Sequence, residues 1–175
     1  DDTVCYKKLE EALAAAQAGD TVTLRADAAL EETQNLDKAI TLDLGGKTLS
    51  CDAGARLMIR AAVTIQDSSA NGVGTVTSAS RNACLIDTQQ GAALTIQGGT
   101  FLCDGEALRA TCGEVDITGG QFIGELNISG YPRDLAVTLS GGEFRQIFSY
   151  NIPFLDLLAD GAAFYKDGQL VNLAE

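Results

Sequence analysis

Segments of three residues with the pattern apolar–polar–apolar recur along most of the chain. Five of them start at intervals of 21, 31, 21 and 22 residues, at 42–44, 63–65, 94–96, 115–117 and 137–139. Alternation with period two indicates a strand with one buried face, and a fixed period of 20–50 residues indicates a solenoid. A repeat of 21–22 residues accommodates three short strands and their turns. The pattern therefore predicts a parallel β-helix whose coils lie about 4.8 Å apart.

A longer motif ending in Gly-Gly-x-Phe occurs three times, at 95–101, 116–122 and 138–144, and 42–49 is a variant of it. We expect the apolar residues of each triad to face inward and the middle residues, such as Asp43 and Asp116, to share an outward column. The last position of the motif is expected to form an internal column of stacked side chains: Leu49, Phe101, Phe122 and Phe144. The Gly-Gly pairs suit coil corners, where positive φ and close backbone approach are needed.

Both ends of the chain have the composition of a cap. Residues 6–19 are rich in Ala, Leu, Glu and Lys, which predicts a helix over 6–18 with Leu9, Leu13 and Ala16 on one face. The triad pattern begins directly afterwards, so a strand is expected over 21–24. Seven of the ten aromatic residues follow position 130, and we expect most of them to plug the open coil. Asp-Gly within 165–171 predicts a hairpin turn.

One interval between triads contains about ten extra residues. It lies between 63 and 94, and its segments 68–74 and 78–82 are rich in Ser, Asn and Gly. We expect a loop or lateral excursion there. Such insertions often form the binding face of a solenoid, although a flexible corner without a ligand explains this composition equally well.

Composition and charge exclude several classes of function. The 175 residues have 12 Lys and Arg against 24 Asp and Glu, a net charge of −12, which argues against a nucleic-acid partner. No apolar run is long enough to span a membrane as a helix. The chain contains no His, so a Ser-His-Asp triad, a Cys-His dyad or a His-containing zinc site is excluded. The five Cys form no C-x-x-C motif, and we expect small buried side chains rather than a metal site or another cofactor site.

Several segments resemble pectate-lyase-like right-handed β-helices. Residues 18–27 are similar to the entry into such folds, and 40–50 resembles a coil of uncharacterised surface proteins from Gram-positive, often gut, bacteria. The Gly-Gly-x-Phe coils and residues 157–165 are similar to the same proteins. This resemblance implies a secreted or cell-surface bacterial protein, in a superfamily that includes lyases, hydrolases, binding modules and adhesin shafts. The chain departs from the family at 45–47, where Gly-Gly-Lys replaces the usual Asn-Gly-His.

Together these features predict one all-β domain over 1–175, a single-stranded right-handed parallel β-helix of about six coils of about 21–22 residues. An N-terminal helical cap is expected over 1–20, the coils over 21–147, and a C-terminal aromatic cap with its hairpin over 148–175.

The residues do not define a catalytic centre. A lyase of this fold needs several acidic residues for calcium with an Arg nearby, and a glycosidase needs two carboxylates about 5–9.5 Å apart. Asp43 and Asp116 are expected about three coils apart, which is too far for such a pair. Four acidic residues near corners could converge, which the sequence alone does not decide: Asp67, Asp87, Asp104 and Glu106.

Carbohydrate binding is the most specific activity that the residues suggest. It needs exposed aromatic platforms with neighbouring hydrogen-bonding groups. The candidate binding residues are Tyr131, Arg133, Asp134, Tyr150 and Asn151. We therefore expect a non-enzymatic secreted or cell-surface module, structural or adhesive, with glycans or a surface polysaccharide as its partners. The alternative is a lyase- or hydrolase-like enzyme acting on acidic glycans. Three or more acidic residues with an Arg in one groove would favour the enzyme, and an exposed aromatic strip would favour binding.

Overall fold

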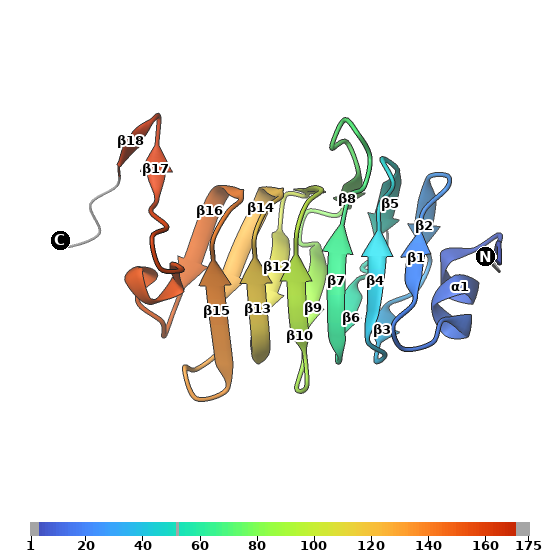
Figure 1. The fold of residues 1–175 in the computed structure, drawn as a ribbon, viewed down its shortest axis with the longest axis horizontal. Coiled ribbons are helices and arrows are strands. Elements are labelled where there is room, and N and C mark those ends of the chain that lie inside the picture. Colours follow the sequence, from blue (N-terminus) through green and yellow to red (C-terminus); the bar gives the residue numbers. More distant parts are fainter. Residues whose placement is uncertain (1–3, 52, 171–175) are drawn as a thin grey trace.

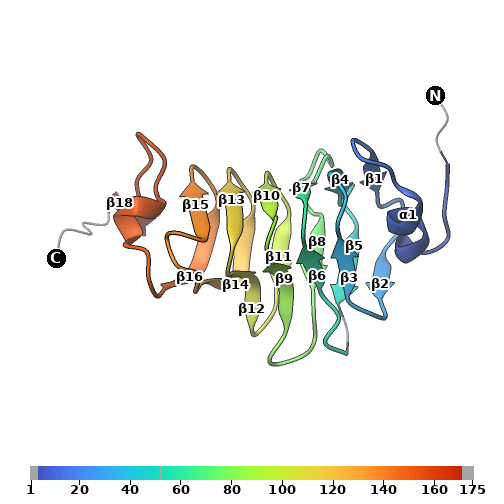
Figure 2. The same cartoon turned by 90° about the horizontal axis from the view of Figure 1, so that it is seen from below.

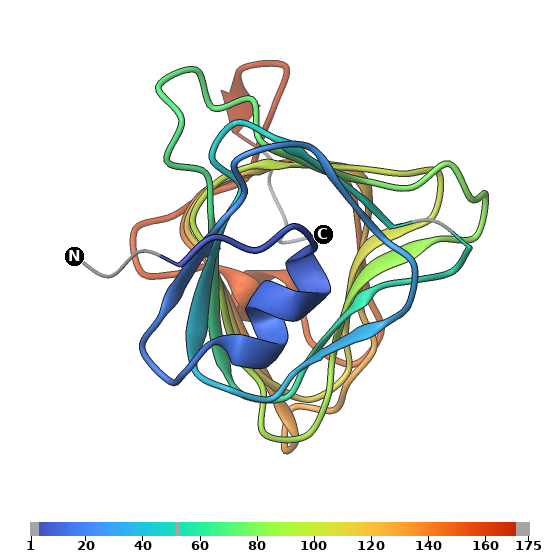
Figure 3. The same ribbon diagram turned by 90° about the vertical axis from the view of Figure 1, so that its right-hand side faces the viewer.

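The protein is a parallel β-solenoid whose coils are stacked along one axis (Figure 1). A computed structural model describes residues 4–51 and 53–170. Each strand of the first face pairs in parallel with the equivalent strand one coil away, which gives a six-stranded sheet. In the view from the N-terminal end, the chain winds clockwise as it recedes (Figure 3), so the coils are right-handed. The predicted architecture of about six coils is confirmed.

Three faces enclose the core. The first face contains β1 (Thr21–Thr23), β4 (Ile40–Asp43), β7 (Ala62–Gln66), β10 (Ala93–Ile96), β13 (Gly113–Ile117) and β15 (Leu135–Leu139). The second contains β2 (Ala28–Leu30), β5 (Thr48–Cys51), β8 (Thr75–Thr77) and β11 (Thr100–Leu102). The third contains β3 (Gln34–Leu36), β6 (Leu57–Ile59), β9 (Cys84–Thr88) and β12 (Glu106–Ala110). In the last two coils, β14 (Gln121–Ile128) and β16 (Glu143–Ser149) run across both of these faces.

The inward columns predicted from the triads form the core. Val63, Leu94, Val115 and Val137 occupy equivalent positions in successive strands and are buried. The second face carries the Phe column: the ring centroids of Phe101 and Phe122 are 4.8 Å apart, and those of Phe122 and Phe144 are 5.0 Å apart. Both pairs are nearly parallel, with interplanar angles of 17° and 18°. Leu49 lies in the same column, separated from Phe101 by Val76.

The predicted outward column is wrong at one position. Thr41, not Asp43, aligns with Thr64, and the column continues through Thr95 to Asp116. Asp43 is only 5% exposed and lies at the corner, where its carboxylate accepts hydrogen bonds from the backbone N–H groups of Gly45 and Ser68. A shift of two residues keeps the same side chains inward, so the alternation of Leu42 and Leu44 did not reveal it.

The N-terminal end is covered by a helix that is shorter than predicted. Helix α1 (Leu9–Ala15) ends where Ala16 adopts an extended ψ of 144°, because residues 16–20 turn the chain into β1. The expected apolar face is confirmed, since Leu9, Leu13 and Ala16 are buried. The structure adds a contact that the sequence pattern did not predict: the Lys38 ammonium donates to the carbonyls of residues 13, 14 and 16 at 3.3, 2.7 and 2.9 Å. A cation suits these unpaired carbonyls at a helix C-terminus.

The C-terminal end is covered mainly by an aliphatic side chain. A 3-10 turn, η1 (Phe154–Leu157), lies across the last coil and buries Leu157 completely. The expectation that most late aromatic residues plug the coil is wrong: only Phe144 and Phe164 pack partly against the core. The exposed ones are Tyr131, Phe148, Tyr150, Phe154 and Tyr165. Tyr131 lies in the loop before β15, and Phe148 faces outward from β16. The remaining rings follow β16, where the chain has left the coils.

The predicted hairpin and the long interval are both confirmed. Strands β17 (Tyr165–Lys166) and β18 (Gln169–Leu170) pair antiparallel, and Asp167 and Gly168 between them both have positive φ, as a tight hairpin turn requires. The rest of the predicted cap, 171–175, lies outside the described residues. The extra residues between 63 and 94 form one loop after β7 (Figure 1) and another between β8 and β9, which extends from the neighbouring coils in Figure 2.

The Phe column generates a stability prediction. Phe122 packs between two rings and is 1% exposed, whereas Phe144 has a ring on one side and is half-buried. We expect Phe122→Ala to lower the free energy of unfolding by about 3–5 kcal/mol and Phe144→Ala to lower it by clearly less. Urea denaturation followed by circular dichroism measures both. Equal losses for the two variants would show that the second neighbouring ring and the deeper burial of Phe122 add no stability.

Candidate functional site

All five predicted binding residues lie at one corner of the solenoid. The corner joins the third face to the first, and it includes the loop 129–134 between β14 and β15 and the residues that follow β16. The two coils are hydrogen-bonded there, since the N–H of Tyr150 donates to the carbonyl of Ile128 at 3.0 Å. The Asn151 side chain donates to the carbonyls of Ser129 and Gly130, both at 3.2 Å. The fold therefore places the Tyr131 loop and Tyr150 on adjacent coils.

The loop that carries Tyr131 is tightly anchored. The Tyr131 carbonyl accepts hydrogen bonds from the N–H groups of Asp134 and Leu135, both at 2.9 Å, and the Asp134 carbonyl accepts one from Gly113 at 2.8 Å. Gly130 lies directly against the preceding coil, and a Cβ atom there would collide with the carbonyl oxygen of Thr111. The loop backbone is therefore fixed by hydrogen bonds within the loop and by contacts with the preceding coil.

Tyr131 combines an exposed ring with a nearby cation. The side chain is 58% exposed, and the Arg133 guanidinium carbon lies 5.6 Å from the ring centroid. Arg133 also donates from Nε to Asp134 Oδ2 at 3.0 Å. A cation–π contact at an exposed position contributes about 0.5–1 kcal/mol. Its main effect here is to orient the Tyr131 ring beside the donors and acceptors of Arg133 and Asp134.

Tyr150 belongs to a second aromatic pair that the sequence analysis identified only in part. It is 75% exposed, and its ring centroid lies 5.7 Å from that of Phe148 at an angle of 52°. Phe148 is 43% exposed and lies opposite Asn127 in the ladder, on the outer side of the third face. The predicted role of the late aromatic residues as a plug does not apply to this pair. The alternation of β16 contained the missing signal, because Ile147 faces inward and Phe148 must therefore face outward.

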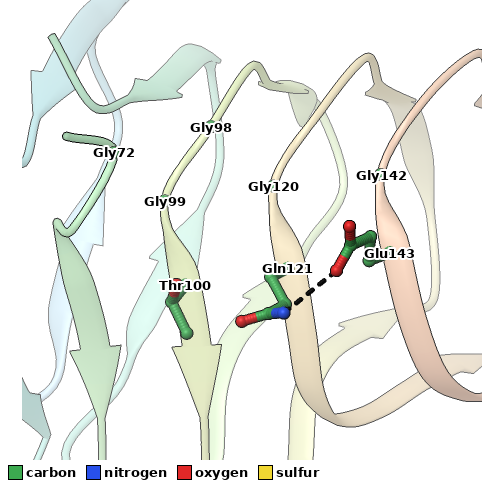
Figure 4. A pocket seen from close by; sticks show the side chains of 8 residues that line it. All are labelled: Gly72, Gly98, Gly99, Thr100, Gly120, Gln121, Gly142 and Glu143. Carbon is green, nitrogen blue, oxygen red and sulfur yellow. Dashed lines mark hydrogen bonds between the residues drawn. The ribbon is translucent and has the colours of Figure 1, made fainter. Parts of the chain in front are cut away.

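A polar groove of about 620 Å³ follows the corner between the first and second faces (Figure 4). Its floor is formed by glycines of successive coils. Gly120 has a φ of +98°, which favours glycine, and a Cβ atom there would lie 3.1 Å from the carbonyl oxygen of Gly99. Its rim is one row of outward side chains, Thr100, Gln121 and Glu143, in which the Gln121 amide donates to Glu143 at 3.0 Å. The glycines are explained by coil packing, and the groove contains no aromatic platform.

A second groove, of about 360 Å³, has the composition expected for an acidic enzyme site. It is lined by Asp104, Glu106, Glu125 and Arg145, among others. Two of the carboxylates already have partners: Glu106 binds Arg109 at 2.6 Å and Asn127 at 2.6 Å, and Glu125 accepts from Gln146 at 3.1 Å. Within residues 4–51 and 53–170, no group of three His, Cys, Asp or Glu side chains is arranged to hold a metal ion.

Ion pairs cross the third face from coil to coil. Asp87 is buried, and its carboxylate lies 3.6 Å from Arg56 and 3.8 Å from Arg109. Arg109 also pairs with Glu106 of its own strand, β12, so each of these charges has a partner of opposite sign. Beneath this network, burial raises the pKa of the Cys84 thiol to about 11. A thiol with this pKa is a weak nucleophile at neutral pH, as expected for a packing residue.

Two carboxylates, the buried Asp43 and the half-buried Asp67, stabilise the corner between the first and second faces. Asp43 accepts from Gly45 and Ser68, and Asp67 accepts from the N–H groups of Gly46, Ser69 and Gly74. Burial alone would raise the pKa of both carboxyls, but these hydrogen bonds outweigh burial and lower both pKa values below 3.8. Both side chains are therefore committed to the backbone of the corner. The expectation that Asp67 could join a catalytic cluster finds no support in its contacts.

Comparisons with family models, with curated proteins and with solved structures found no match. The class of protein therefore follows from the fold alone: a right-handed parallel β-solenoid with an exposed aromatic corner in its last two coils. In the described part of the chain, no helix has the length and apolar character needed to cross a membrane.

The lowered pKa values generate a prediction about pH. Because the folded pKa of Asp43 and Asp67 is below that of the unfolded chain, their stabilisation is present at neutral pH and is lost as pH falls below about 3.8. We expect Asp67→Asn to lower the melting temperature at pH 7 and to weaken its dependence on pH between about 5 and 2. Asp116→Asn, at an exposed position, is the matched control. If the melting temperatures of Asp67→Asn and of the unsubstituted protein changed equally with pH, this assignment would be contradicted.

Proposed function

We propose that the protein is a non-enzymatic structural or adhesive module, secreted or at the cell surface, that binds carbohydrate at the corner formed by Tyr131, Tyr150 and Asn151. The observation that carries this proposal is the exposure of two tyrosine rings on adjacent, hydrogen-bonded coils. A tyrosine ring offers a large apolar surface for the C–H groups of a sugar at little entropic cost, and its hydroxyl group remains available for a hydrogen bond.

The surroundings of the two rings suit a polyhydroxylated ligand. Arg133 supplies N–H donors, Asp134 supplies carboxylate acceptors, and both are largely exposed at 81% and 53% of their side-chain surface. Phe148 extends the apolar area next to Tyr150. The loop backbone would not have to be ordered on binding, because residues 129–134 are already hydrogen-bonded to one another and to the preceding coil. A rigid, open corner of this kind favours binding along a polysaccharide over enclosure of a small molecule.

The enzyme alternative is favoured by one observation, the groove with Asp104, Glu106, Glu125 and Arg145. Two of its three carboxylates, Glu106 and Glu125, would have to leave Arg109, Asn127 and Gln146 before they could bind a substrate. The aromatic corner needs no such rearrangement, and for that reason we place binding ahead of catalysis. The resemblance to surface proteins of Gram-positive bacteria is compatible with either function and supports the proposed location.

A polysaccharide array probed with the purified protein, with and without calcium, tests this function. We expect reproducible binding to one sugar class, and we expect Tyr131→Ala and Tyr150→Ala each to weaken it by roughly tenfold. Tyr165→Ala is the matched control, because Tyr165 is 68% exposed but lies on the hairpin, away from the 129–134 loop (Figure 1).

Two outcomes would contradict this proposal. One is the absence of binding on a broad array, which would favour a purely structural module. The other is binding that neither Tyr131→Ala nor Tyr150→Ala weakens. Calcium-dependent binding to acidic polymers, together with release of new chain ends, would favour the enzyme, and Arg145→Ala would then be the informative variant.

A further inference from the structure

The last strand of the solenoid has an open edge. β16 pairs with β14 on one side, and no strand within the described residues pairs with its other side. The edge of β15 and the N-terminal end of the solenoid are covered to a greater extent. β15 is partly covered, because Leu139 forms a bridge with Leu158 and accepts a hydrogen bond from Ala159. The N-terminal coil is covered by α1, whose Leu9 and Leu13 are buried. An open edge presents unpaired N–H and C=O groups and is a template for another strand.

The hydrogen bonds of β16 identify which backbone groups are unpaired. The backbone N–H groups of Glu143 and Tyr150 point toward the preceding coil, where they donate to the carbonyls of Gly120 at 2.9 Å and Ile128 at 3.0 Å. Successive residues of a strand direct these groups to opposite sides. Phe144 is one residue from Glu143, and Ile147 is three residues from Tyr150. Both are odd numbers of steps, so Phe144 and Ile147 direct their backbone N–H and C=O groups to the open side, away from β14. The strand bends between them, where its register against β14 shifts.

The side chains of β16 form a pattern that reads the same in both directions. From 143 to 148, the order is exposed, half-buried, exposed, exposed, half-buried, exposed. The half-buried residues are Phe144 and Ile147, which face inward above Phe122 and Leu126. In an antiparallel pair, residues directly opposite each other point to the same side. A strand with this symmetry therefore matches a second copy of itself, about a centre between Arg145 and Gln146.

We propose that the chain forms a two-fold symmetric dimer in which β16 pairs antiparallel with β16 of a second copy. The axis passes between Arg145 and Gln146, so that Phe144 lies opposite Ile147 of the other copy. Each of these opposed pairs exchanges two backbone hydrogen bonds, because both residues direct their backbone N–H and C=O groups to the open edge of the strand.

The same arrangement covers apolar surface at this end of the solenoid. The Phe column that runs from Phe101 ends at Phe144, and in the dimer the exposed side of that ring meets an apolar side chain from the second copy. Phe154 and Leu155 of the cap, 38% and 58% exposed, lie at the same end and gain a surface to pack against. Head-to-tail growth into a fibre is blocked by α1, and for this reason the closed dimer is the expected assembly.

Sedimentation equilibrium over a range of protein concentrations tests the dimer. We expect a concentration-dependent rise from the monomer mass to twice that value. Gln146→Lys places a cation opposite Arg145 of the second copy, twice per dimer, and should weaken the dimer roughly tenfold. The monomer should fold normally, since the lysine can keep a contact with Glu125, which now accepts from Gln146 at 3.1 Å.

Two further variants make the test specific for this register. Arg145→Glu combined with Gln146→Lys places opposite charges across the axis and should restore the dimer. Gln121→Lys is the matched control, because the Gln121 amide makes the equivalent contact with Glu143 but belongs to the interior strand β14. A monomer at every concentration overturns the proposal, as does a dimer that Gln146→Lys leaves unchanged or that Gln121→Lys weakens equally. These outcomes are separate from carbohydrate binding, which is measured with the tyrosine variants.

Discussion

The structure depends on the parallel pairing of each strand with the equivalent strand one coil away. This pairing places equivalent side chains directly above one another, about 4.8 Å apart. An inward position must therefore be filled with a side chain that packs against its own equivalents. The nearly parallel rings of Phe101, Phe122 and Phe144 show the result, with centroids 4.8 and 5.0 Å apart. A polar residue at any such position would interrupt a column that extends through several coils.

The same constraint separates structural positions from positions that are available for function. Residues on the faces are restricted by their neighbours above and below, and the third face uses its charges to balance one another, as Arg56, Asp87 and Arg109 do. At the corners, some side chains serve the backbone: Asp43 and Asp67 accept hydrogen bonds from several N–H groups. Tyr131 and Tyr150 have no such role. They lie on anchored backbone with their rings in solvent, which is why the candidate binding site lies at their corner.

The two ends of the solenoid are closed in different ways. At the N-terminus, α1 covers the core, and Lys38 binds the carbonyls at its end. At the C-terminus, Leu157 covers the core, but the edge of β16 has no neighbouring strand in the described chain. Four exposed apolar side chains follow or belong to this strand: Phe148, Tyr150, Phe154 and Leu155. The asymmetry of the ends, together with the symmetry of β16, leads to the proposed dimer.

The amino-acid sequence by itself determined which side chains face inward, because alternation with period two requires only local information. It also predicted the coil length, the Phe column, the apolar face of α1 and the Asp167-Gly168 turn, each of which is encoded within a few neighbouring residues. The candidate binding residues were predicted as well, although their proximity was not. Alternation does not distinguish registers that differ by two residues, and so Asp43 was assigned to the wrong column.

Only the tertiary structure decided the features that depend on contacts between distant residues. The three carbonyls bound by Lys38 lie more than twenty residues away in the chain. The contact between the Phe148 and Tyr150 rings, whose centroids are 5.7 Å apart, depends on the path of the chain at the end of β16. The meeting of Tyr131, Tyr150 and Asn151 at one corner depends on the stacking of the last two coils. Composition specifies what a residue can contact, and the winding of the chain decides which contact it makes.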